Sequence, residues 1–156
     1  MPNEQATITL CVRSVWDLYF QARKFPPGSE VLMTAINIQD MIKITEEHGL
    51  VPVPVDIDPY TLMPSLDAIK AATTEKSVAC LFGFIWGVTY DVAPFATYLH
   101  SQNIDIIEDT AQSWRGLETF RGSPHAVMTM FSFGTIKLQS AFYGAVSIVR
   151  DRVLFD

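Results

Sequence analysis

The sequence has no cluster of basic residues and no apolar run long enough to cross a membrane. Acidic residues outnumber basic ones, 17 to 11, which gives a formal net charge of −6. Nucleic-acid-binding surfaces are built from clustered lysine and arginine, so this class of partner is not expected. The apolar run VACLFGFIWGV, residues 78–88, falls short of the ~20 residues that a transmembrane helix needs. We therefore expect no nucleic acid and no membrane among the partners.

Cysteine is also scarce, since the chain contains only Cys11 and Cys80. The two are far apart in the sequence and have no histidine cluster beside them, which favours buried free thiols over a disulfide or a metal site. The first residues, MPNEQATITL, lack the basic and apolar regions of a secretion signal. These features predict a cytoplasmic protein with no metal.

What the chain does contain is enough apolar sequence for one globular domain. It has 156 residues, of which 49% are hydrophobic and 18% are charged. A chain of this length buries about two thirds of the surface that it exposes when unfolded. This composition excludes a disordered protein and predicts a well-formed core.

Helical and extended segments alternate along the chain. Pro26-Pro27-Gly28 is a strong helix stop, Ser65 is a typical N-cap, and Pro94 falls in a first helical turn, where proline is tolerated. Proline within LVPVPVDID, residues 50–58, predicts a strand at the edge of a sheet. The expected helices are 10–25, 38–49, 65–73 and 91–103, and the expected strands are 30–36, 50–58, 77–84, 104–109, 126–133 and 142–149.

This alternation predicts an α/β fold with a mostly parallel sheet and helices on both faces. Ligands of such sheets bind beyond the carboxyl ends of the strands. Asp109 closes the strand IDII, and Lys137 follows the strand AVMTMFSF in the turn FGTIK. The fold rule alone therefore predicts that Asp109 and Lys137 lie in one crevice.

A lysine and an aspartate in one crevice suggest a particular cofactor. Burial favours the neutral amine of a lysine, which can attack a carbonyl group and form a Schiff base. Pyridoxal 5′-phosphate (PLP) is attached in this way, and a carboxylate beside its pyridine nitrogen keeps that nitrogen protonated. The alternatives are an ordinary turn lysine at Lys137 and a helix N-cap at Asp109 for the segment TAQSW.

The wider sequence context resembles one family. EDTAQSWRG, residues 108–116, and MFSFGTIK, residues 130–137, resemble the paired motifs of the sugar-nucleotide (DegT/StrS) aminotransferases, which are fold-type I PLP enzymes. PPGSEVLMTAI, GLVPVPVDID and GAVSIVRD resemble further segments of the same family in the same order. The resemblance covers residues 10–152 and implies the large, PLP-binding domain of such an enzyme.

The resemblance also implies roles for single residues. Lys137 would hold the cofactor as a Schiff base and shuttle protons, and Asp109 would pair with the pyridine nitrogen. Gln112 would bind the ring oxygen of the cofactor, and Ser132 its phosphate. A related branch of the family has histidine at the lysine position and catalyses dehydration, so Lys137 favours an aminotransferase.

Three segments depart from the pattern of the family. The phosphate-binding turn before the first large helix reads LCVRS, residues 10–14, where Arg13 and Ser14 remain candidate phosphate ligands. Ile36 and Ile38 stand where the family often has an aromatic ring that stacks on the cofactor. Phe84 stands where a histidine is common.

The resemblance implies a longer protein, a donor, an acceptor and a subunit partner. A complete member has about twice this many residues, so residues 1–156 are expected to form part of the large domain, with the small C-terminal domain absent. An amino acid would donate the amino group to a keto group, plausibly on a nucleotide-linked sugar, and the full-length enzyme would be a homodimer. The rival hypothesis is a catalytically inactive remnant with an interaction role or no role of its own.

Overall fold

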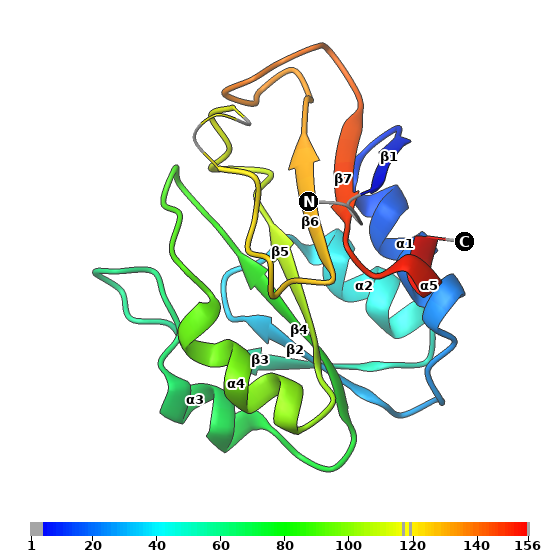
Figure 1. Cartoon of the computed structure of the whole chain (residues 1–156), viewed down its shortest axis with the longest axis vertical. Helices are drawn as coiled ribbons and strands as arrows, with labels where there is room; N and C mark the ends of the chain where they lie inside the picture. The colour runs from blue at the N-terminus through cyan, green and yellow to red at the C-terminus, as the bar shows by residue number, and fades with distance from the viewer. Residues whose placement is uncertain (1–4, 117, 119, 156) are drawn as a thin grey trace.

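A computed structural model describes residues 5–116, 118 and 120–155 of the chain. They form one sheet with helices on both faces (Figure 1). The strands are β1 (Gln5–Thr9), β2 (Glu30–Thr34), β3 (Val51–Val55), β4 (Ser77–Gly83), β5 (Asp105–Asp109), β6 (Met128–Ser132) and β7 (Ala145–Val149). The helices are α1 (Val12–Arg23), α2 (Gln39–Glu47), α3 (Leu66–Ala72), α4 (Ala93–Ser101) and α5 (Arg152–Phe155).

The sheet has seven strands in the order β1-β7-β6-β5-β4-β2-β3. Neighbouring strands from β3 across to β6 are parallel. β7 is antiparallel to both of its neighbours, β6 and β1. The predicted α/β class and mostly parallel sheet are confirmed, and β3, which contains Pro52 and Pro54, lies at the edge as expected.

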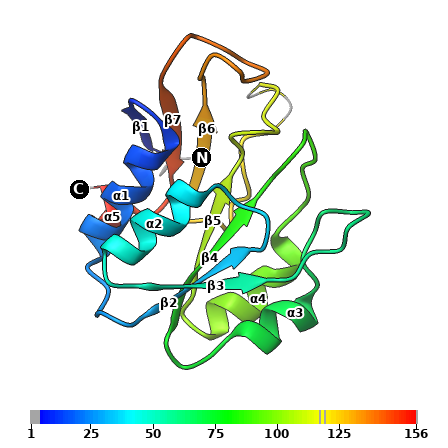
Figure 2. The same cartoon turned by 180° about the vertical axis from the view of Figure 1, so that it is seen from behind.

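Two apolar layers hold the helices against the sheet. α1 and α2 cover one face and α3 and α4 cover the other, as the two opposite views show (Figure 2). α1 buries Val12, Val15, Trp16, Tyr19 and Phe20, and this helical spacing forms a single apolar stripe. Because successive strand residues point to opposite faces, the central strands β2, β4 and β5 contribute to both layers.

The predicted helix starts agree with the observed caps. Ser65 Oγ accepts a hydrogen bond of 3.0 Å from the backbone N–H of Ala68, which caps α3. Pro94 falls in the first turn of α4. In the described part of the chain, no helix is both long and apolar enough to span a membrane.

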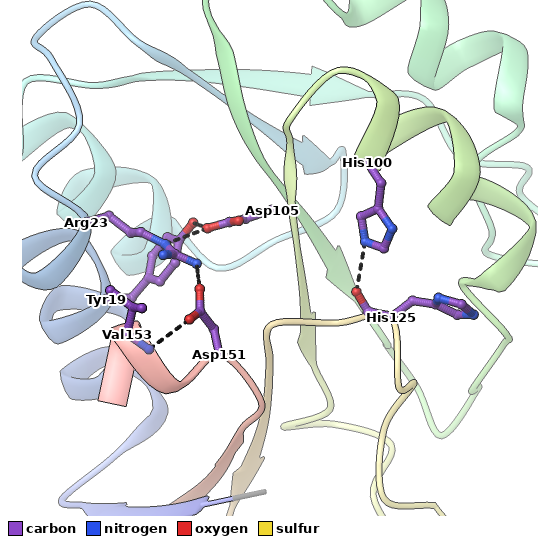
Figure 3. A network of polar contacts seen from close by, with 7 residues as sticks. All are labelled: Tyr19, Arg23, His100, Asp105, His125, Asp151 and Val153. Atoms are coloured by element: carbon purple, nitrogen blue, oxygen red, sulfur yellow. Dashed lines mark hydrogen bonds and ion pairs between the residues drawn. The ribbon is translucent and has the colours of Figure 1, made fainter. Parts of the chain in front are cut away.

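A polar network joins α1 to the start of β5 and to α5 (Figure 3). Arg23 Nε donates to Asp105 Oδ2 at 2.7 Å, and the Tyr19 hydroxyl donates to the same oxygen at 2.8 Å. The Arg23 guanidinium also pairs with Asp151, whose other oxygen accepts from the backbone N–H of Val153 in α5. This network fixes the amino end of β5, and the opposite end of that strand carries Asp109.

Candidate active site

A cavity lies at the carboxyl ends of the parallel strands. Its lining comes from four connections: residues 36–38 after β2, residues 83–85 after β4, Asp109 with Gln112 after β5, and Lys137 after β6. These connections meet because parallel strands place their carboxyl ends at the same edge of the sheet. The structure therefore brings together Asp109, Gln112 and Lys137, as the sequence predicted.

Asp109 is the last residue of β5, and its side chain lies on the face that α1 and α2 cover. Its Oδ1 atom accepts a hydrogen bond of 2.9 Å from the backbone N–H of Ala111. Burial raises the pKa of the Asp109 carboxyl above its ordinary value, while the Ala111 N–H and the positive charge of Lys137 act in the opposite direction. A cationic group placed beside this carboxyl would favour its ionised form.

The alternative of a capped helix at Asp109 is wrong. Residues 110–114 form a turn, and no helix is found among the described residues between β5 and β6. The hydrogen bond from the Ala111 N–H to Asp109 resembles that of a helix N-cap, but the segment that follows is a turn. Thr110 fixes this turn, since its Oγ1 donates to the backbone carbonyl of Met130 at 2.6 Å.

Lys137 lies in the connection between β6 and β7, residues 133–144. Its backbone N–H donates to the Gly134 carbonyl at 3.0 Å, which closes a tight turn. The lysine residue is half-buried, whereas its neighbours Ile136 and Leu138 are exposed. The turn thus directs the lysine, rather than its apolar neighbours, toward the cavity.

Ser132 lies near Lys137 but outside the lining of the cavity. It is the last residue of β6 and lies on the same face as Asp109, because Asp109 pairs with Met130 two residues earlier. A Cβ atom added to Gly134 would lie 3.8 Å from both Ser132 Oγ and Lys137 Cγ. The serine hydroxyl is therefore within reach of a ligand that also contacts Lys137.

Arg13 and Ser14 occupy the first turn of α1 and do not line the cavity. Arg13 Nε lies 3.4 Å from Asp40 Oδ2, and both side chains are about half exposed. Ser14 Oγ lies 3.4 Å from the Cys11 sulfur, and Cys11 is only partly buried. Burial raises the pKa of Cys11, but hydrogen bonds from Ser14 and the charge of Arg13 outweigh it and lower the pKa overall.

The two isoleucines that replace an aromatic ring do line the cavity. Ile36 and Ile38 are 42% and 41% exposed and lie on the connection between β2 and α2. Phe84, which replaces a histidine, also lines the cavity and packs edge-on against Tyr90 and Phe120. Apolar contact is thus available to a flat ring at this place.

Asn37 is a polar residue of the cavity that the sequence did not single out. Its Nδ2 atom is buried and has no hydrogen-bond partner within the described residues. Its Oδ1 atom accepts from the backbone N–H of Ile38 at 2.8 Å. The available signal was its place directly after a buried strand, at the edge where Asp109 and Lys137 were expected.

The residues of the cavity fit pyridoxal phosphate. A primary amine and a partly buried carboxyl group line one space, apolar side chains border it, and an unpartnered amide donor faces it. These are the groups that hold the aldehyde, the pyridine nitrogen and the ring of this cofactor. A Cβ atom at Gly83 would lie 3.1 Å from Thr34 Oγ1, so glycine at this position lets the end of β4 lie close to Thr34 of β2.

The sheet and this cavity define the class of the protein as an α/β fold of the PLP-dependent transferases. The sequence matches the DegT/DnrJ/EryC1/StrS aminotransferase family over residues 14–154, and the chain belongs to that family. It is 28% identical to the lipopolysaccharide biosynthesis protein RfbH of Salmonella typhimurium over 121 residues, which is 78% of this chain and 27% of RfbH. It is 26% identical to the 3-amino-5-hydroxybenzoate synthase of Amycolatopsis mediterranei over 139 residues, 86% of this chain and 35% of the synthase.

Solved structures share the fold. An aminotransferase from Psychrobacter cryohalolentis superposes with a TM-score of 0.85 at 22% identity, over 96% of this chain and 38% of that protein. NtdA from Bacillus subtilis, with bound PMP, gives 0.82 at 22% identity, over 96% and 34%. A variant of GDP-4-keto-6-deoxymannose-3-dehydratase, ColD, with bound GDP-perosamine gives 0.83 at 20% identity, over 96% and 41%. The chain spans well under half the length of these proteins.

Proposed function

We propose that this chain is the cofactor-binding part of a PLP-dependent aminotransferase. It would transfer an amino group from an amino acid to a keto group on a nucleotide-linked sugar. The observation that carries the proposal is the shared cavity of Asp109, Gln112 and Lys137 at the carboxyl edge of the sheet. Membership of the aminotransferase family supports the same chemistry.

Lys137 and Asp109 divide the chemical work in this proposal. The Lys137 Nζ atom would hold the cofactor through its aldehyde and would move a proton to and from the reacting carbon of the substrate. The Asp109 carboxylate holds a proton on the pyridine nitrogen of the cofactor. Bound pyridoxal phosphate supplies an electron-withdrawing ring, which the proton held by Asp109 makes more effective.

Gln112, Ser132, Arg13 and Ser14 would position the cofactor. The Gln112 amide would donate to the ring oxygen, and the Ser132 hydroxyl would donate to the phosphate. Arg13, Ser14 and the first backbone N–H groups of α1 provide a second phosphate contact, since a helix N-terminus favours anions. Support for this placement comes from the direction of α1, which starts at the same edge of the sheet as the cavity.

Two relatives support the proposed substrate class. One is named as a lipopolysaccharide biosynthesis protein, and the ColD structure holds a nucleotide-linked amino sugar. Both aminotransferases and 3-dehydratases occur among the similar structures. Lys137 favours amino transfer, because the dehydratase branch of the family carries histidine at this position.

We further propose a homodimer in the cytoplasm. Large apolar side chains are exposed on the connection that carries Lys137 and on the neighbouring turn after β1, including Ile136, Phe142 and Leu10. Exposed apolar surface of this kind supports a protein interface.

Cys11 and Cys80 are free thiols, which remain reduced in the cytoplasm.

Single-turnover amino transfer tests the proposed function. The protein is loaded with PLP and mixed with L-glutamate and a panel of other common amino acids, and the released 2-oxo acid is measured. Asp109→Asn should slow the transfer on the order of 10²-fold, because the developing charge loses its stabilising partner. Lys137→Ala should slow it further.

Lys43→Ala is the matched control for the lysine substitution. Lys43 is an exposed lysine of α2 that does not line the cavity, so this variant should react like the wild type. Transfer by Lys137→Ala at the wild-type rate, or no transfer by the wild type with any amino acid of the panel, would contradict the proposal.

A further inference from the structure

Glu108 is a buried acidic residue that the proposed chemistry does not use. It precedes Asp109 in β5, so its side chain points to the opposite face of the sheet, toward α3 and α4. The residue is 0% exposed. Its Oε1 atom has no hydrogen-bond partner in the part of the chain that the structure describes.

The other oxygen of Glu108 is the centre of a hydrogen-bonded chain. Oε2 accepts from Thr129 Oγ1 at 2.6 Å and from the backbone N–H of Ser123 at 2.9 Å. Thr129 Oγ1 in turn accepts from Arg150 Nη1 at 2.9 Å. Arg150 Nη2 donates to the Arg121 carbonyl at 2.7 Å.

This chain joins the three strands on which the proposed active site depends. Glu108 belongs to β5, whose next residue is Asp109, and Thr129 belongs to β6. Arg150 directly follows β7. The connection that carries Lys137 begins at β6 and ends at β7. The hydrogen bonds of Glu108, Thr129 and Arg150 therefore link both of these strands to β5, which carries Asp109.

The backbone nearby is shaped to admit these side chains. Gly122 has a φ of +89°, and a Cβ atom added there would lie 2.0 Å from Thr129 Oγ1 and 2.7 Å from Glu108 Oε2. Burying a carboxyl group with one unpartnered oxygen is costly, and apolar packing would join strands at lower cost. The retained network therefore points to a role beyond stability.

We propose that Glu108 is a positioning residue that, through Thr129 and Arg150, sets the placement of Lys137 relative to Asp109. This inference rests on the proposed function, because the placement of Lys137 relative to Asp109 matters only if the two residues hold one cofactor between them. The side chains of Glu108 and Thr129 lie on the face of the sheet that α3 and α4 cover. Asp109 lies on the opposite face, so neither Glu108 nor Thr129 would contact the cofactor.

The test compares two substitutions at Thr129 with one at Thr45. Thr129→Val removes the hydroxyl that links Glu108 to Arg150, and Thr129→Ser retains it. Thr45→Val in α2 is the matched control, since Thr45 is also 0% exposed. Thr45 Oγ1 donates to the Met41 carbonyl at 2.9 Å and accepts from Trp16 Nε1 at 3.2 Å. Both threonine hydroxyls thus donate once and accept once.

The primary readout is the rate at which PLP at saturating concentration forms an adduct on Lys137 that borohydride reduces to a stable secondary amine. Urea unfolding of the cofactor-free protein gives the stability of each variant separately. Thr129→Val should slow adduct formation roughly 10- to 100-fold, because small misplacements of reacting groups have effects of this size. Thr129→Ser and Thr45→Val should react at the wild-type rate, although Thr45→Val is less stable.

Two results would overturn the inference: a wild-type rate for Thr129→Val, or an equal slowing by Thr45→Val. If Thr129→Val does not fold, Thr129→Ala takes its place under the same criteria, since it removes the hydroxyl without adding a methyl group. Absence of an adduct on wild-type Lys137 would instead contradict the proposed function, so the two failures are distinguishable.

Discussion

At the scale of single residues, two adjacent acidic side chains lie on opposite faces of β5, where Glu108 is fully buried and Asp109 is partly buried. Burial raises the pKa of both, and in each case hydrogen bonds and a nearby cation offset the rise only in part. Asp109 faces the cavity with Lys137, whereas Glu108 faces Thr129, Ser123 and the charge of Arg150. Desolvation thus raises the pKa of both carboxyl groups, although Asp109 lies beside the cavity and Glu108 lies within a hydrogen-bonded chain.

The raised pKa of Glu108 predicts a pH dependence of folding. A carboxyl group whose pKa is higher in the folded than in the unfolded protein contributes stability below its unfolded value of about 4.3, and loses it as the pH rises through the folded value. Glutamine does not titrate. The free energy of unfolding of Glu108→Gln, relative to wild type, should therefore increase as the pH rises from about 4 to about 8.

Urea unfolding of both proteins across this pH range measures the difference. The charged groups that act on Glu108 are Arg150, which opposes the rise in pKa, and Asp91, which adds to it. A constant difference between variant and wild type at every pH would contradict a raised Glu108 pKa.

At the scale of elements, the connection from β6 to β7 combines a half-buried lysine with exposed apolar side chains. Gly144 at its end donates a backbone hydrogen bond of 3.0 Å to the Leu10 carbonyl, which places the turn after β1 beside it. Six large apolar side chains on this connection, on β1 and on the turn after β1 are at least 61% exposed. They are Ile8, Leu10, Ile136, Leu138, Phe142 and Tyr143.

Substitution of Phe142 tests whether this surface is the proposed dimer interface. Phe142→Glu places a charge on the surface and should shift the protein toward monomer in sedimentation equilibrium, because burying an unpaired charge is costly. Tyr60→Glu is the control, since Tyr60 is 94% exposed and lies far along the chain between β3 and α3. A wild type that is monomeric at every concentration, or a Phe142→Glu variant that associates like wild type, would contradict the interface.

At the scale of the whole molecule, the sequence predicted β2 to β7 as strands and missed β1. Continuous apolar runs identify β2 and β4, because buried parallel strands are continuous apolar runs, and the prolines of β3 place that strand at the edge. Residues 5–9 were not predicted as a strand, since they are few and only alternate residues are partly buried. The reversed direction of β7 was also missed, although a connection of residues 133–144 without a helix favours an antiparallel return.

Some residues of the candidate site could be placed from the sequence, and others could not. Asp109 and Lys137 could be placed in one crevice because the rule for strand ends needs only the order of elements. The ion pair of Arg13 with Asp40 depends on how α1 packs beside α2, which the sequence pattern does not specify. Asn37 was missed because its unpartnered amide is visible only once the cavity is formed.

The central claim is that Lys137 and Asp109 hold one cofactor between them. The most direct measurement is reduction of the PLP-treated protein with borohydride, followed by mass spectrometry of its peptides. The account predicts that the modified peptide contains Lys137 and that Asp109→Asn weakens PLP binding without moving the modification. A modification spread over Lys24, Lys43, Lys70 and Lys76, or none at Lys137, would contradict the account.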